Sequence, residues 1–134
     1  MLLSRIPHDM AYGGGGFVGG KLYLVSDLGA LDIYDPATGT WSTGPQRPFR
    51  YCTPTSTTLQ AKLYLVGCRN DLDATGVYPM VVFDPKTGSW SQAAAPPTPA
   101  EGHSWTLSRV FSGGQPRLEL IGGAKPGNNW QYTP

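Results

Sequence analysis

The chain has 134 residues, which is room for one modest domain, and 10 lysine and arginine residues against 9 aspartate and glutamate residues give a net charge of +1. That balance excludes a general electrostatic attraction to nucleic acid or to an anionic membrane surface. The 18 glycines and 13 prolines disfavour helices, whereas 40% of the residues are hydrophobic and 11% aromatic, which is too many for a disordered chain. Composition therefore predicts a turn-rich, mostly β protein.

Targeting signals are not evident in the sequence. No apolar run approaches the roughly 20 residues that span a bilayer. Only two leucines precede Ser4 and Arg5 at the N-terminus, too few for the apolar region of a signal peptide. We therefore expect no membrane partner, and the compartment stays open, with the cytoplasm slightly favoured.

An internal repeat is the main signal in the sequence. The pentapeptide KLYLV occurs twice, at Lys21–Val25 and Lys62–Val66. Downstream, YDPATGTW at 34–41 matches FDPKTGSW at 83–90, with Asp, Pro, Thr, Gly and Trp in register. The two copies lie 41 residues apart at the pentapeptide and 49 apart at the tryptophan, a period typical of four-stranded propeller blades. A weaker third copy follows, with RLELIGG and then NWQYTP.

Each unit is expected to hold up to four antiparallel strands in chain order. The first strands are predicted at about Met10–Val18, Cys52–Leu59 and Ser104–Phe111. The second strands are the two KLYLV segments and RLELI, which are apolar on both faces, as suits a sheet packed between two others. The third strands are predicted at Ala30–Tyr34, Tyr78–Phe83 and Asn129–Tyr132. Two short fourth strands begin at Trp41 and Trp90.

The segment Asp-Pro-x-Thr-Gly between the third and fourth strands is a turn with a physical reason. Aspartate accepts backbone N–H bonds, proline presets φ, and glycine adopts the left-handed conformation. The residues that carry the structural repeat are therefore Asp35, Gly39, Trp41, Asp84, Gly88 and Trp90.

These segments resemble the kelch repeat of the galactose oxidase-like β-propellers. In that family a strand ending in a glycine pair precedes a Tyr-Asp-Pro-x-Thr-x-x-Trp segment, and each repeat forms one blade. The glycine pair is intact here only at Gly122-Gly123. The resemblance implies an all-β fold, a partial propeller of about three four-stranded antiparallel blades, the last incomplete. Residues 1–134 would form one propeller segment, with blades at about 7–45, 48–95 and 99–134. It also implies that Trp41 and Trp90 pack between neighbouring blades.

Three blades are too few to close a ring, which typically needs four to eight. The segment would then be a fragment of a larger propeller, which we favour, or pair with another chain, or stand alone as an open stack. A homodimer completing a six-bladed ring is one form of the second alternative.

No catalytic, cofactor or metal site can be selected from the sequence. The glycine run before Lys21 nearly matches a phosphate-binding loop, but Leu22 stands where Ser or Thr would hold Mg²⁺, so we interpret it as a hairpin. His8 and His103 lack metal-ligand spacing. Cys52 is expected as a near diagonal neighbour of Cys68, with two buried thiols favoured over a disulfide. We therefore predict no cofactor.

Function is expected at the loops, where binding residues concentrate. The loops entering first strands and those joining second to third strands share one edge. Candidate interaction residues on this rim are His8, Asp27, Arg50, Arg69, Asn70, Asp71 and Asp73. The resemblance implies a non-catalytic module for a protein partner, without nucleic acid. The alternative is part of a carbohydrate-acting propeller enzyme, of the oxidase or sugar epimerase type, and enzyme activity stays uncertain.

Overall fold

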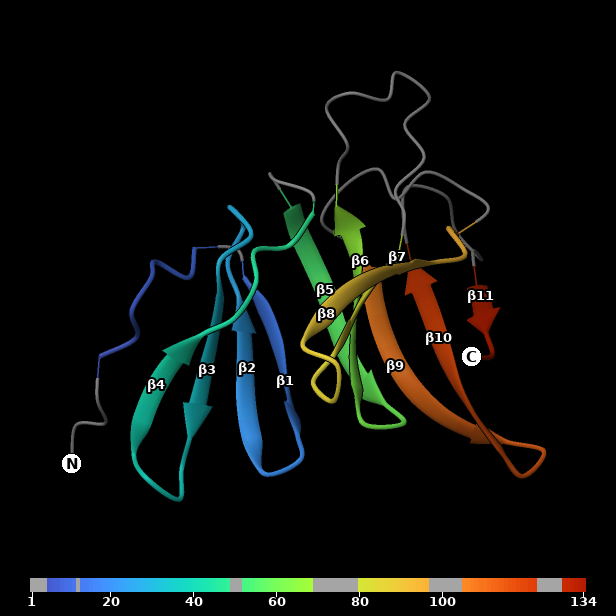
Figure 1. The fold of residues 1–134 in the computed structure, drawn as a ribbon. Helices are drawn as coiled ribbons and strands as arrows, with labels where there is room; N and C mark the ends of the chain where they lie inside the picture. The colour runs from blue at the N-terminus through green and yellow to red at the C-terminus, as the bar shows by residue number, and fades with distance from the viewer. Residues whose placement is uncertain (1–4, 12, 49–51, 69–79, 97–104, 123–128) are drawn as a thin grey trace.

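The computed structural model describes residues 5–11, 13–48, 52–68, 80–96, 105–122 and 129–134. Over these residues the protein is all-β, with three antiparallel sheets and no helix (Figure 1). Because no described segment is helical, none is a helix that could cross a membrane. The prediction of an all-β fold made of successive antiparallel sheets is confirmed.

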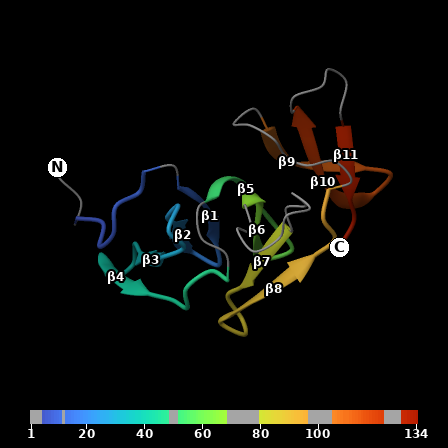
Figure 2. The same ribbon diagram turned by 90° about the horizontal axis from the view of Figure 1, so that it is seen from above.

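Each sheet is formed by strands that follow one another in the chain. Sheet 1 contains β1 (Gly14–Val18), β2 (Lys21–Val25), β3 (Leu31–Asp35) and β4 (Thr40–Thr43), in that order. Sheet 2 contains β5 (Cys52–Leu59), β6 (Lys62–Cys68), β7 (Met80–Asp84) and β8 (Ser89–Ala93). Sheet 3 contains β9 (Trp105–Ser112), β10 (Gln115–Gly122) and β11 (Asn129–Tyr132). Seen from above, the sheets stand side by side, with β1 next to β5 and β5 next to β9 (Figure 2).

The three sheets share one register. Equivalent pairs in the three ladders are Leu22 with Tyr34, Leu63 with Phe83, and Leu118 with Tyr132. The weak third sequence copy is therefore structurally equivalent to the other two. One expected boundary was wrong: β1 begins at Gly14 rather than near Met10, because the chain turns there and the Gly13 N–H donates to the Met10 carbonyl at 3.3 Å.

The two Asp-Pro turns have the same geometry. The side chain of Asp35 accepts the Ala37 N–H at 2.9 Å, and that of Asp84 accepts the Lys86 N–H at 2.8 Å. Gly39 and Gly88 close the turns with φ of 70° and 66° and donate to the aspartate carbonyls, both at 2.8 Å. Such positive φ values favour glycine. The turns therefore have the chemistry expected from the sequence.

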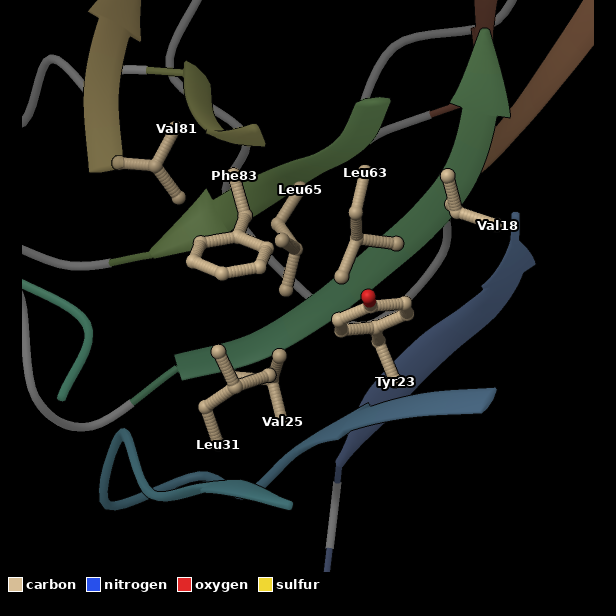
Figure 3. Close-up of a cluster of buried hydrophobic side chains, with 8 residues drawn as sticks. All are labelled: Val18, Tyr23, Val25, Leu31, Leu63, Leu65, Val81 and Phe83. Carbon is tan, nitrogen blue, oxygen red and sulfur yellow. The ribbon is translucent and has the colours of Figure 1, made fainter. Parts of the chain in front are cut away.

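The core lies between the sheets. Sheets 1 and 2 meet through Val18, Tyr23, Val25 and Leu31 on one side and Leu63, Leu65, Val81 and Phe83 on the other (Figure 3). Sheets 2 and 3 meet through Leu59, Tyr64, Val66, Met80 and Val82 against Leu107, Leu118 and Leu120. Sheet 2 is thus apolar on both faces because both are covered.

The two repeated tryptophans have different surroundings. Trp90 packs against the core between sheets 1 and 2, and its indole N–H donates to the Pro45 carbonyl at 2.8 Å. Trp41 packs against Tyr34 with the two rings tilted and their centroids 4.9 Å apart, on the face of sheet 1 that turns away from sheet 2. Only Trp90 therefore lies between two described sheets.

Candidate functional site

Three segments gather at one edge of sheet 1. They are residues 5–11, which lead toward β1, the β2–β3 loop (Ser26–Ala30), and the connection after β4 (Gly44–Arg47). The connection is held by backbone bonds, because the Gly44 N–H donates to Leu31 and the Arg47 N–H donates to Gly29, both at 2.9 Å. Backbone hydrogen bonds therefore hold the connection after β4 against β3 and the β2–β3 loop at this edge.

The β2–β3 loop is fixed by its own hydrogen bonds. The Ser26 N–H donates to the Ala30 carbonyl at 2.9 Å, and the Ser26 hydroxyl oxygen accepts the Ala30 N–H at 3.0 Å. Gly29 has a φ of 92°, a conformation that glycine adopts without strain. The loop is a tight, closed turn.

Arg47 stabilises this loop through a side-chain hydrogen bond. Its side chain is 2% exposed and donates from Nη2 to the Asp27 carbonyl at 2.9 Å. Burial lowers the pKa of Arg47 to about 10, opposed by the nearby Asp27 charge, so the guanidinium stays protonated at neutral pH. A buried charged donor gives a strong bond to a loop carbonyl. Gln46 adds a second support by donating to the Leu28 carbonyl at 3.2 Å.

Leu28 lies at the tip of this supported loop. Its side chain is 55% exposed, although its backbone N–H donates to the Asp27 carboxylate at 2.9 Å and its carbonyl is held by Gln46. The loop therefore presents an apolar side chain on a fixed backbone.

His8 and Asp32 form a hydrogen-bonded pair at the same edge. Asp32, in β3, is fully buried, and its Oδ1 lies 2.8 Å from His8 Nδ1. The other carboxylate oxygen accepts the His8 backbone N–H at 3.1 Å. Because a carboxylate only accepts, Nδ1 carries the proton, and a neutral ring keeps Nε2 as an acceptor. The His8 side chain is 49% exposed.

A groove of about 430 Å³ separates these elements. Its apolar wall is formed by Leu28, Ala30 and Leu31, and its polar lining by His8, Thr43 and Gln46 beside Gly44. The groove can therefore hold a small group that combines an apolar side with hydroxyl or amide groups.

The predicted rim residues are placed only in part. His8 and Asp27 lie at this edge, on the segments that flank the groove or its loop. Arg50, Arg69, Asn70, Asp71 and Asp73 lie outside the described residues, as does His103. Their grouping stays a prediction.

Asp32 was missed by the sequence reasoning, although a signal existed. In the shared register Asp32 stands opposite Leu24, and its equivalent in sheet 2 is Val81, opposite Leu65. An acidic residue at a position that the repeat fills with a buried valine calls for a hydrogen-bonding partner. His8 supplies it from 24 residues away.

Metal-binding and cysteine chemistry add little at this site. The part of the chain that the structure describes contains no group of three His, Cys, Asp or Glu residues arranged to hold a metal ion. Cys52 stands directly opposite Cys68 in the β5–β6 ladder, whereas a near diagonal position was expected. The difference arises because the register shifts between Cys52 and Thr55.

The comparisons with known proteins support the fold. No family model and no curated protein matches the chain. The chain is similar to a solved structure described as "Structure of YjhT", with a TM-score of 0.71 and 20% sequence identity. The match covers 90% of this chain but 36% of that one, so this chain spans about a third of the structure it resembles. At this identity the likeness shows an all-β fold with antiparallel sheets, and nothing of function.

Proposed function

We propose that the chain is part of a kelch-type β-propeller, with sheets 1 to 3 as consecutive blades, and that it works as a non-catalytic module that binds a protein partner. Two features support the propeller. The three ladders share one register, and neighbouring sheets pack face to face with their first strands side by side. The sequence period of 41 to 49 residues is that of such blades.

The exposed Leu28 on its supported loop carries the proposed binding function. An apolar side chain on a rigid backbone requires little further ordering on binding, so less of the interaction energy is lost to conformational entropy. Ser26, Arg47 and Gln46 hold the loop in one conformation before any partner arrives. The groove beside Leu28 offers a complementary depression for a partner side chain.

Site-specific photo-crosslinking tests this proposal in the organism that makes the protein. A benzophenone side chain is placed at position 28 and, as a control, at Phe111, which is 77% exposed and lies in sheet 3. We expect one protein to crosslink at position 28 and none at position 111. Leu28→Asp should abolish copurification of that protein, and Phe111→Asp should not. Equal crosslinking at both positions, or copurification that survives Leu28→Asp, would contradict the proposal.

The His8–Asp32 pair supports a second function, a part in a carbohydrate-acting enzyme. A buried carboxylate orients the imidazole so that Nε2 can accept a proton from a hydroxyl group. Thr43 and Gln46 line the same groove and could hold other hydroxyls. A panel of mono- and disaccharides separates the two functions. Sugar turnover that disappears in His8→Gln but persists in Leu28→Asp favours the enzyme, and no turnover favours the binding module.

A further inference from the structure

The two ends of the sheet stack are chemically unequal. Directly opposite residues of an antiparallel ladder lie on the same face, and faces alternate along each strand. The face of sheet 1 that turns away from sheet 2, called the outer face of sheet 1, therefore carries Gly15, Phe17, Leu22, Leu24, Asp32, Tyr34, Trp41 and Thr43. The corresponding outer face of sheet 3 carries Thr106, Ser108, Val110, Arg117, Glu119, Ile121, Asn129 and Gln131.

The outer face of sheet 1 has the composition of a buried face. Its Leu22, Leu24 and Tyr34 are equivalent to Leu63, Leu65 and Phe83, which are 0%, 0% and 2% exposed between sheets 1 and 2. In sheet 1 the equivalent residues are only half-buried, and Phe17 on the same face is 57% exposed. A sheet that is apolar on both faces is normally covered on both.

The outer face of sheet 3 has the composition of a face in contact with water. Glu119 accepts a hydrogen bond from the side chain of Gln131 at 2.8 Å, and most of its neighbours are polar. At the position of Glu119, sheets 1 and 2 carry Tyr23 and Tyr64, which are both buried. Alternation of one apolar and one polar face is typical of a sheet that faces solvent on one side.

We propose that the outer face of sheet 1 binds one further β-sheet of the same repeat, whose contact face carries tyrosine and aliphatic residues at the positions of Val18, Tyr23, Val25, Leu31 and Ile33. The interface repeats twice within the chain, between sheets 1 and 2 and between sheets 2 and 3. The added sheet continues this established interface by one more step.

A second copy of the chain does not supply the required face. Its Tyr23 and Val25 are already buried against its own sheet 2, and the equivalent Tyr64 and Val66 against its sheet 3. Of the described sheet faces, a second copy offers only its own outer faces. Head-to-tail closure would set Glu119 and Gln131 against Phe17 and Leu22 and would bury polar groups in an apolar interface, which is unfavourable. Two-fold pairing of two outer faces of sheet 1 would bring Asp32 of both copies into the contact and would not reproduce the interface that repeats between sheets 1 and 2 and between sheets 2 and 3. Continuity with that repeated interface therefore points to a separate sheet, and this inference does not depend on binding at Leu28.

The exposed face is tested first on the chain itself with the fluorescent dye bis-ANS, which binds exposed apolar surface. We expect Phe17→Gln with Leu22→Gln to reduce dye fluorescence by more than half. The matched control, Val110→Gln with Ile121→Gln on the outer face of sheet 3, should change it little. Equal reductions by both pairs would overturn the inequality of the two faces.

The occupant is tested by supplying the sheet. A copy of residues 7–47 is inserted between Ile6 and Pro7, which keeps the 41-residue spacing seen between Pro7 and Pro48. Within the copy, Phe17→Gln and Leu22→Gln make its own outer face polar. We expect dye fluorescence to fall to the level of the Phe17→Gln and Leu22→Gln variant and the unfolding temperature to rise.

The control insertion also carries Tyr23→Glu and Val25→Glu in the copy and should restore both dye fluorescence and the original unfolding temperature. If both insertions behave alike, the proposed contact face is wrong. Light scattering on the unmodified chain decides the remaining case, in which the copy fails to fold. A dimer that Phe17→Gln with Leu22→Gln converts to a monomer would overturn the proposal in favour of a second copy, and a monomer supports it.

Discussion

Asp32 of sheet 1 and Val81 of sheet 2 occupy the same place in the repeat but have opposite chemistry. Each stands opposite a leucine of the second strand, and each is 0% exposed. Val81 is covered by the side chains of sheet 1, whereas Asp32 is covered by His8 from the segment that leads toward β1. The comparison shows that the same position can be buried either by a neighbouring sheet or by a hydrogen-bonded side chain from a loop segment, as in the His8–Asp32 pair.

This difference links the candidate site to the outer face of sheet 1. His8 reaches Asp32 because no described sheet covers that position. The His8–Asp32 pair therefore covers the Asp32 carboxylate on this face and also orients the imidazole beside the groove. In sheet 2 the equivalent Val81 lies instead among Leu63, Leu65 and Phe83.

The largest expected effect comes from moving the acid to sheet 2. Val81→Asp places a carboxylate in an aliphatic environment where the surrounding core offers no cationic partner. A buried charge without a partner costs about 5 kcal/mol, comparable to the whole stability of a small domain. Urea denaturation followed by circular dichroism should show a largely unfolded variant. A native-like midpoint would mean that the core between sheets 1 and 2 is far more open to water than the burial of Val81 indicates.

A smaller effect distinguishes the covered face from the outer face. Phe83→Ala removes a ring that is 2% exposed and should cost about 4 kcal/mol, whereas Tyr34→Ala, at the equivalent half-buried position, should cost about 1 kcal/mol. Both free energies of unfolding come from denaturant titrations. Equal losses would show that the outer face of sheet 1 is already covered as completely as the inner one. Loss of the contact between Tyr34 and Trp41 is part of the smaller value.

The fold was predictable from the sequence because the repeat constrains it at several levels at once. The KLYLV strands, the Asp-Pro turns and the tryptophans recur together, so strand order and register follow from local chemistry. The site was less predictable. His8 was expected at the correct edge, but its partner Asp32 is 24 residues away and meets it only because residues 5–11 pass along sheet 1. No local pattern encodes that path.

The β2–β3 loop illustrates the same limit. Asp27 was expected at the rim, but Arg47, which supports it, was not singled out, because it follows β4 and approaches the loop only after sheet 1 has formed. The Cys52 register was missed by one position for a related reason. The ladder shifts its register between Cys52 and Thr55, away from the turn at Gln60 and Ala61 from which the pairing was counted.

A change in stability of intermediate size is expected when the His8–Asp32 pair is removed. Asp32→Val gives sheet 1 the apolar character of its equivalent position and should cost about 2 kcal/mol, because the two His8 donors lose their acceptor. His8→Leu removes one of these donors, and a double-mutant cycle measured by urea denaturation isolates the coupling between the two side chains. Strictly additive losses would show that the pair contributes no interaction energy and that Asp32 is buried for another reason.

The smallest effect concerns the two Asp-Pro turns, in which sheets 1 and 2 should behave alike. The Ala37 N–H, and next the Lys21 side chain, lower the pKa of Asp35 below its usual 3.8. The Lys86 N–H does the same for the pKa of Asp84, opposed by burial and assisted by the Lys62 side chain. A pKa lowered on folding stabilises the folded state above the unfolded value of 3.8, and this contribution is lost as the pH falls through the lowered value.

Asp35→Asn and Asp84→Asn should therefore each lower the free energy of unfolding by a similar, small amount at neutral pH and leave it almost unchanged below the lowered pKa, which flattens the acid limb of the stability curve. The neutral amide still accepts the turn N–H, so only the proton-linked part disappears. Free energies of unfolding measured from neutral pH to below pH 3.8 provide the readout. Both carboxylates are at the surface, so added salt should weaken the contribution of Lys21 and Lys62 equally. A flattening confined to one variant would show that the two turns, alike in their hydrogen bonds, differ in the charge around them.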